Sequence, residues 1–294
     1  MKTSNTLVWL SSLAIALALV AASVGLFWRD GGQPFAFQTL RGETAQIYGQ
    51  GLYRYDTVLI AVGFKTGDAV TLALGIPLLV VSLWLYRRGS LRGGILLAGT
   101  LAYLLYNYAS MAFGAAYNNM FLVYIALTAA TLLGFVISVT SFDRQTVPAR
   151  FSDRLPRRSI AIFLIVSGIA LFLIWLLLSI VPALLAGGAP PEVASYTTVI
   201  TFVVDMAIIA PALAVAGRLL LRREALGYVL APVLLVFTDV LGISLLAMGI
   251  VQQAAGLMSI GQFIGFVISF AILTLFALGF TVVLFRNVSD TVAR

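Results

Sequence analysis

Apolar residues occur in eight long runs along the chain, and polar connections separate each run from the next. A helix needs about 20 mostly apolar residues to cross the hydrocarbon core of a bilayer, and every run comes close to that length. The runs are 6–27, 69–86, 93–115, 120–139, 160–186, 197–217, 226–250 and 263–285. The pattern predicts an all-α, polytopic membrane protein in which residues 1–294 form a single integral domain of about eight transmembrane helices.

The composition agrees with this fold class and narrows the chemistry. Apolar residues make up 61% of the chain and charged residues 10%, whereas soluble domains have about 45–50% and about 25%. Because Cys and His are both absent, thiol catalysis, imidazole catalysis and the usual zinc and haem sites are excluded. The basic residues form no patch with interleaved aromatics. We therefore expect no cofactor, no metal, no nucleic-acid partner and no enzymatic activity.

The distribution of basic residues predicts the orientation. With eight spans, both termini lie on one side, and that side holds 14 of the 18 Lys and Arg residues. The cytoplasmic connections of membrane proteins are enriched in Lys and Arg. The fourteen are Lys2, Arg87, Arg88, Arg92, Arg144, Arg150, Arg154, Arg157, Arg158, Arg218, Arg222, Arg223, Arg286 and Arg294. We expect an inner or plasma membrane protein with both termini cytoplasmic, whose surroundings are membrane lipids.

The first run has two interpretations. Lys2 followed by an apolar stretch and the small residues Ala21-Ala22-Ser23 fits a cleavable signal peptide, but the stretch is longer than a typical signal core. Retention as a transmembrane helix is the favoured interpretation.

Two connections stand out. The outer connection 28–68 is too long for a simple turn, and within it residues 57–64 follow Asp56 as a short apolar segment. We expect a short helix lying at the outer interface; the alternative is a lid over an outward-facing cavity. The inner connection 140–159 carries five Arg and two Asp, and it divides the chain into two four-helix halves.

Two carboxylates within the predicted spans are the first candidates for function. Asp205 and Asp239 are the only charged residues in these spans, and no basic residue accompanies them. A charge at mid-bilayer costs at least about 2.5 kcal/mol, so each needs an explanation. Both can be ligand- or proton-responsive groups. Alternatively, both residues have only a structural role in helix packing. Asp205 would then be hydrogen-bonded to Tyr or Ser hydroxyls, and Asp239 to Asn107 or Thr238.

A polar and aromatic stripe runs along the third predicted span. Its members recur at helical spacings of three and four, and they are Tyr103, Tyr106, Asn107, Ser110 and Tyr117. At 1.5 Å rise per residue, Asn107 and Asp205 lie about 12 Å deep and Asp239 about 16 Å deep. If these helices converge, the side chains line an outward-opening polar pocket with aromatic walls, suited to an amphipathic or cationic solute.

Small residues and prolines add packing expectations. Ala14, Ala18 and Ala22 in the first run, and Gly261, Gly265 and Ser269 in the last, have the four-residue spacing of helix packing seams. Kinks are expected at Pro77, Pro211 and Pro232, and a break at Pro182.

Two resemblances complete the analysis. Paired Asp residues and Pro211-Ala212-Leu213 invite comparison with intramembrane aspartyl proteases, but the Tyr-Asp and Gly-x-Gly-Asp motifs are absent. The segments Gly51-Leu52-Tyr53-Arg54-Tyr55-Asp56 and Arg87-Arg88-Gly89-Ser90-Leu91-Arg92-Gly93, with Tyr117-Asn118, Asp205 and Arg222-Arg223, are similar to those of uncharacterised multi-pass bacterial membrane proteins. That resemblance implies a membrane fold and brings no activity or site residue.

The leading hypothesis is a transporter or receptor-like binder of a small solute or lipid, which uses a polar pocket in the outer half of the membrane. A non-transporting scaffold, or a subunit that contacts a membrane partner or a second copy, is the main alternative. An intramembrane aspartyl protease is a remote one.

Overall fold

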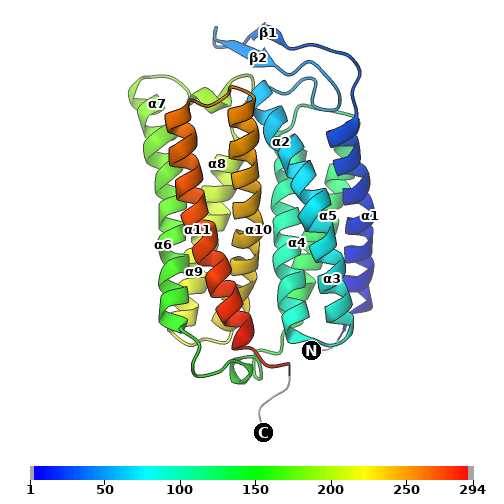
Figure 1. Cartoon of the computed structure of the whole chain (residues 1–294), viewed down its shortest axis with the longest axis vertical. Helices are drawn as coiled ribbons and strands as arrows, with labels where there is room; N and C mark the ends of the chain where they lie inside the picture. Colours follow the sequence, from blue (N-terminus) through cyan, green and yellow to red (C-terminus); the bar gives the residue numbers. More distant parts are fainter. Residues whose placement is uncertain (1–2, 291–294) are drawn as a thin grey trace.

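The computed structural model describes residues 3–290, and most of them belong to a bundle of long helices that run roughly parallel to one axis (Figure 1). Single uninterrupted helices are α1 (Asn5–Phe27), α4 (Leu91–Gly114), α5 (Phe121–Thr140), α10 (Gly227–Ala254) and α11 (Ile260–Arg286). Segmented helices are α2 (Val58–Val70) with α3 (Ile76–Arg87), α6 (Arg157–Trp175) with α7 (Val181–Leu185), and α8 (Ile200–Val204) with α9 (Ala210–Leu221). A small antiparallel hairpin pairs β1 (Phe35–Gln38) with β2 (Thr44–Ile47).

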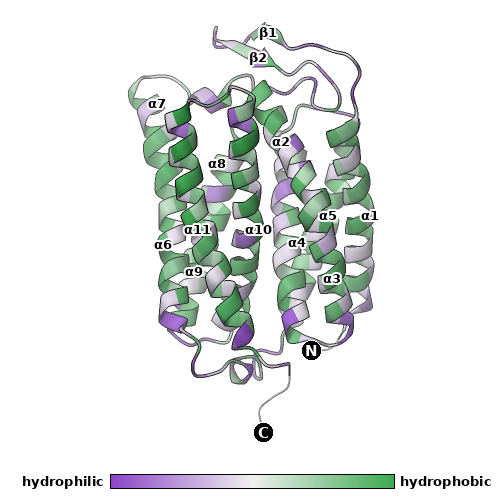
Figure 2. Cartoon of the chain, in the orientation of Figure 1, coloured by the Kyte–Doolittle hydropathy of each residue, from purple (hydrophilic) through white to green (hydrophobic). Residues whose placement is uncertain are grey.

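The all-α membrane fold predicted from the apolar runs is confirmed. Within the described residues, eight helices are long and apolar enough to cross a membrane, and each coincides with a predicted run to within a few residues except the second. Figure 2 shows the reason, because the helices are hydrophobic over most of their length while hydrophilic residues gather at their ends and in the connections.

The second span was predicted wrongly. It is one continuous 30-residue helical segment, Val58–Arg87, so residues 57–64 are its outer end and not a separate interfacial helix. The Thr57 side chain caps it by accepting from the Ile60 N–H. The polar residues that obscured it in the sequence face the interior, since Thr66 and Asp68 are buried. Asp68 and Lys65 therefore lie within a span, which corrects the expectation that Asp205 and Asp239 are the only charged residues there.

Three of the spans contain a π-helical turn, and each turn precedes a proline by the same interval. The turns are Thr71–Gly75, Leu176–Ile180 and Asp205–Ile209, and Pro77, Pro182 and Pro211 are the second residues of the helical segments that follow. Proline lacks an N–H and crowds the preceding turn, and a π-turn accommodates both by widening the helix. Pro232 lies inside α10 without such a turn.

The helices form two halves, which we define as α1–α5 and α6–α11. Within the first half α1 packs on α2, α3 and α5, and α4 packs on α3 and α5; within the second, α6 packs on α9, and α10 packs on α9 and α11. The halves meet mainly where α10 contacts α4 and α2. Ala14, Ala18 and Ala22 are fully buried as predicted, whereas methyl groups added at Gly261 or Gly265 would meet nothing within 4 Å.

The first and last described residues lie at the same end of the bundle. The Ser4 N–H donates to the Tyr86 hydroxyl at the end of α3, and Asp290 accepts from the Leu91 N–H at the start of α4, 2.7 Å away. The same end carries the Arg-rich connections, including 141–156, which joins the two halves. Which side of the membrane this end faces stays a prediction, and Lys2 and Arg294 lie outside the described residues.

Candidate functional site

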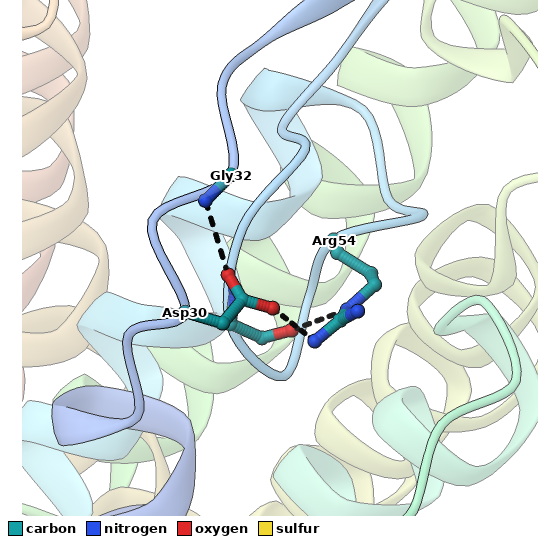
Figure 3. Close-up of polar contacts among 4 residues, drawn as sticks. Asp30, Gly32 and Arg54 are labelled. Carbon is teal, nitrogen blue, oxygen red and sulfur yellow. Dashed lines mark hydrogen bonds and ion pairs between the residues drawn. The ribbon is translucent and has the colours of Figure 1, made fainter.

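The connection between α1 and α2, at the end of the bundle opposite the termini (Figure 1), is a folded structure held by Asp30 (Figure 3). Its carboxylate accepts from the Gly51 N–H at 2.9 Å, from the Gly32 N–H at 3.4 Å and from the Arg54 guanidinium. The Gly51 hydrogen bond is the main cause that holds the pKa of Asp30 below its usual value. The connection is therefore held close to the end of α1, and its hairpin extends over the end of the bundle that lies opposite the termini (Figure 1).

Two contacts tie this connection to the second half. The Tyr196 hydroxyl donates to Asp56 Oδ1 at 2.7 Å and accepts from the Thr57 N–H at 3.1 Å. Arg41, in the hairpin turn, donates to the carbonyl oxygen of Ala194. Burial of Asp56 raises its pKa to about 6, although hydrogen bonds from the Ala116 N–H and Tyr196 oppose the shift. We call Asp56 and Tyr196 the outer latch.

A cavity of about 50 Å³ lies beside the outer latch, between the two halves. We call it the junction cavity. It is lined by Ile60 and Phe64 of α2, Ser110 and Gly114 of α4, and Glu192, Tyr196 and residues 198–201 of the second half. A buried water needs a cavity of roughly 10–15 Å³, so the junction cavity has room for about three or four waters, or for a solute of similar size.

The polar atoms of the junction cavity are incompletely paired. Glu192 Oε1 accepts from the Ser179 hydroxyl at 2.9 Å, but its Oε2 is buried without a hydrogen-bond partner, and so is the Ser110 hydroxyl. Buried polar groups are hydrogen-bonded in the great majority of cases, and an unpaired one costs about 1–3 kcal/mol. The two orphaned oxygens at one cavity therefore indicate a place where a ligand or water completes the bonding.

Asp205 lies one helical layer deeper than the cavity wall. Asp205 forms a cluster with Trp175 and Tyr106. Thr201 lies four residues before Asp205, Ser110 four residues after Tyr106, and Ser179 four residues after Trp175, so the two layers are one helical turn apart on three helices. In that cluster Trp175 Nε1 donates to Asp205 Oδ2 at 2.8 Å, and the Tyr106 hydroxyl is a second hydrogen-bonding partner. Asp205 is only 5% exposed, and its Oδ1 has no partner.

Asp239 occupies a different place. The polar group beside it is Thr281 of α11, although neither Asp239 Oδ1 nor the Thr281 hydroxyl makes a hydrogen bond of normal geometry. The predicted partners are engaged elsewhere, since Thr238 donates to the carbonyl oxygen of Leu234 at 2.8 Å. The partners of Asp239 differ from those of Asp205, and Asp239 does not line the junction cavity. Convergence of the two carboxylates stays a prediction.

The aromatic stripe on α4 is divided among several environments. Ser110 lines the junction cavity and Tyr106 contacts Asp205. Tyr103 is buried beside Thr71 and Ser244, and Asn107 donates to the Thr71 hydroxyl at 3.5 Å. Tyr117 is 77% exposed because α4 ends at Gly114, before the helical spacing reaches it. One stripe therefore faces two neighbours, α2 and the second half.

A buried cluster in the first half was missed from the sequence. Tyr53 donates to Asp68 Oδ2 at 2.6 Å, and the Tyr124 hydroxyl lies 3.5 Å from that of Tyr53. Asp68 is fully buried, and Gly25 of α1 packs directly against its carboxylate. The sequence contained one sign of this cluster, because Asp68 follows Lys65 by three residues within an otherwise apolar region. A helical period of 3.6 residues places Asp68 on the inward face.

Other surfaces offer less. A groove of about 230 Å³ between α6 and α9 is lined only by apolar residues and glycine, among them Phe172 and Pro211, and it opens to the outside of the bundle. Within residues 3–290, no three His, Cys, Asp or Glu side chains gather as a metal site. The chemistry of the described bundle therefore rests on single buried carboxylates and hydroxyls.

Comparisons with known proteins give no further guidance. No family model matches the chain, and no curated protein or solved structure matches it either.

Proposed function

We propose that this membrane protein binds a small solute in the junction cavity, as a transporter or a receptor-like binder whose two halves move relative to each other. The observation that carries the proposal is that two residues lining one cavity between the halves, Ser110 and Glu192, each have a buried side-chain oxygen without a hydrogen-bond partner. Sites at the interface of two helix bundles are where many transporters bind their substrates. Asp205 then lies on the route from this cavity toward the middle of the membrane.

The size of the cavity favours a small solute over a lipid. Sites for drug-sized ligands are about 300–1,000 Å³, and the junction cavity has about 50 Å³. The apolar groove between α6 and α9 is larger, but it has no polar group to select a ligand and is suited to acyl chains of the surrounding bilayer. A polar headgroup would find no partner there.

The scaffold or subunit alternative is favoured by a separate feature. In its most apolar stretch, 17% of the residues of α11 are buried, against 67% for α10, so α11 offers a wide apolar face to lipid or to another chain. However, a partner that binds through the carboxylates would need them at the surface, and Asp205 and Asp239 are 5% and 6% exposed. A protease would need the two carboxylates to share one water, and their separate partners give that idea no support.

Cysteine accessibility tests the proposed function, because the chain has no Cys of its own. We expect Ser110→Cys to react with a small, water-soluble methanethiosulfonate reagent in the folded protein. Ser11→Cys is the matched control: Ser11 is also a buried serine with an unpaired hydroxyl, but it lies on α1, away from the cavity. Equal and negligible reaction of both variants in folded protein would mean that no solute reaches the cavity.

The same approach tests the orientation, which we propose to be cytoplasmic for the Arg-rich end. Ser195 and Ser152 are both exposed serines in connections at opposite ends of the bundle. A membrane-impermeant thiol reagent added to intact cells should label Ser195→Cys and leave Ser152→Cys unlabelled until the membrane is permeabilised. The reverse pattern would place the Arg-rich end outside.

A further inference from the structure

We propose that the solute of the junction cavity is a small organic cation, a primary ammonium of about two to four non-hydrogen atoms. This inference rests on the proposed function and names its ligand class. It follows from three features of the described residues: which polar atoms are unpaired, where the basic side chains are engaged, and how the remaining walls are built.

The unpaired atoms require a hydrogen-bond donor. Glu192 Oε2 and, one layer deeper, Asp205 Oδ1 are carboxylate oxygens, which accept hydrogen bonds when ionised. Ser110 supplies a hydroxyl that accepts as readily as it donates. A buried carboxylate without an opposite charge is costly, and the cost falls when a cation bound beside it satisfies the free oxygen. An ammonium brings both the positive charge and three N–H donors.

The protein itself supplies no such cation at the cavity. None of the lining residues is Lys or Arg. Three basic residues at the outer end are engaged elsewhere: Arg54 pairs with Asp30, Lys65 donates to the Tyr48 hydroxyl at 3.2 Å, and Arg41 donates to the Ala194 carbonyl. Glu192 is therefore the one charged residue among the described residues that line the cavity, and its carboxylate attracts a cation and repels an anion.

The other walls fit a short carbon skeleton. Ile60, Val199 and Ile200 are aliphatic, and Phe64 and Tyr196 add aromatic rings. Aromatic faces attract organic cations, and aliphatic walls accept the methyl or ethyl part that an inorganic ion lacks. With room for about three or four waters, the cavity admits methylammonium or ethylammonium and excludes a tetraalkylammonium ion.

Protection of a reporter thiol tests the ligand class. Thr201 also lines the cavity, and Thr201→Cys leaves both Ser110 and Glu192 in place. The rate of its reaction with an uncharged thiol reagent is measured in purified protein at constant ionic strength, with ethylammonium, ethanol, acetate or tetraethylammonium added. We expect ethylammonium alone to slow the reaction. Adding Glu192→Gln should raise the ethylammonium concentration needed for half protection by about tenfold or more.

A matched variant and a second measurement guard against misfolding. Asp143→Asn also removes one carboxylate, from an exposed inner connection, and should leave protection unchanged. If Glu192→Gln does not fold, Ser110→Ala takes its place in the Thr201→Cys background, with a smaller expected loss because a neutral hydroxyl is removed. Ethylammonium should also raise the melting temperature of the unsubstituted protein, and ethanol should not.

The outcomes separate this inference from the proposed function. Equal protection by ethanol, protection by acetate, or undiminished protection in Glu192→Gln would overturn the cationic class, while a reactive Thr201→Cys keeps the cavity as a solute site. Protection by none of the compounds in a reactive variant also overturns the class. An unreactive Thr201→Cys in folded protein, together with an unreactive Ser110→Cys, would overturn the proposed function and this inference with it.

Discussion

Gly25→Ala should destabilise the protein by about 2–4 kcal/mol, although it adds a single methyl group. Gly25 lies on α1 where the helix packs on the Asp68 cluster, and an added Cβ would collide with Asp68 Oδ2 and lie 2.7 Å from Tyr53 Oη. Neither oxygen can retreat easily, because the two share a 2.6 Å hydrogen bond. Helix α1 would have to move away from α2, and the packing of its buried alanines would be lost with it.

The effect is measured as the free energy of unfolding in mixed detergent micelles, by far-ultraviolet circular dichroism. Gly261→Ala is the control, since this helical glycine on α11 has nothing within 4 Å of an added methyl group. Alanine is the better helix former, so that variant should be unchanged or up to about 1 kcal/mol more stable. The double variant Gly25→Ala/Asp68→Ala should be less destabilised than the sum of its single changes. A Gly25→Ala protein as stable as Gly261→Ala would mean that the Asp68 cluster is not tightly packed.

The number and position of the spans could be predicted from the sequence because hydrocarbon imposes a length on every helix that crosses it. The faces of those helices could not be predicted in the same way. Lipid and protein interior are both apolar, so an apolar residue carries no sign of which one it contacts. Helices α10 and α11 illustrate this, because both are strongly apolar, yet α10 is largely buried and α11 is largely exposed at the surface of the bundle.

Two buried polar features could not be predicted from the sequence, each for a further physical reason. Lys65 and Asp68 interrupt the apolar run of the second span, and only the folded bundle shows that Asp68 turns inward to Tyr53. The junction cavity depends on the irregular segment before α8, where Ala194 adopts a φ of 41°, a region that residues other than glycine and asparagine rarely occupy. Propensity gives no indication of such a turn, so Glu192 and Tyr196 were missed. Asp205 and Ser110 were found because burial of a polar group in a span is itself the signal.

Acidification from pH 6 to pH 4 should stabilise the protein through Asp56. The pKa of Asp56 is about 6 in the folded protein and its ordinary value is 3.8, so the folded state binds a proton more tightly than the unfolded state. The sign follows from linkage: the stabilisation is fully present below pH 3.8 and is lost as the pH rises through 6. A difference of about 2 pKa units corresponds to about 3 kcal/mol in total, of which about 2 kcal/mol is lost between pH 4 and pH 6.

Asp56→Asn isolates this contribution, because an amide keeps a hydrogen-bonding oxygen for Tyr196 and Ala116 and does not titrate. The free energy of unfolding of the unsubstituted protein should fall from pH 4 to pH 6 by about 2 kcal/mol more than that of Asp56→Asn. Asp143→Asn is the control, since the Gln145 N–H holds the pKa of Asp143 below its ordinary value, and its titration lies below this window. Parallel curves for Asp56→Asn and the unsubstituted protein would contradict the prediction.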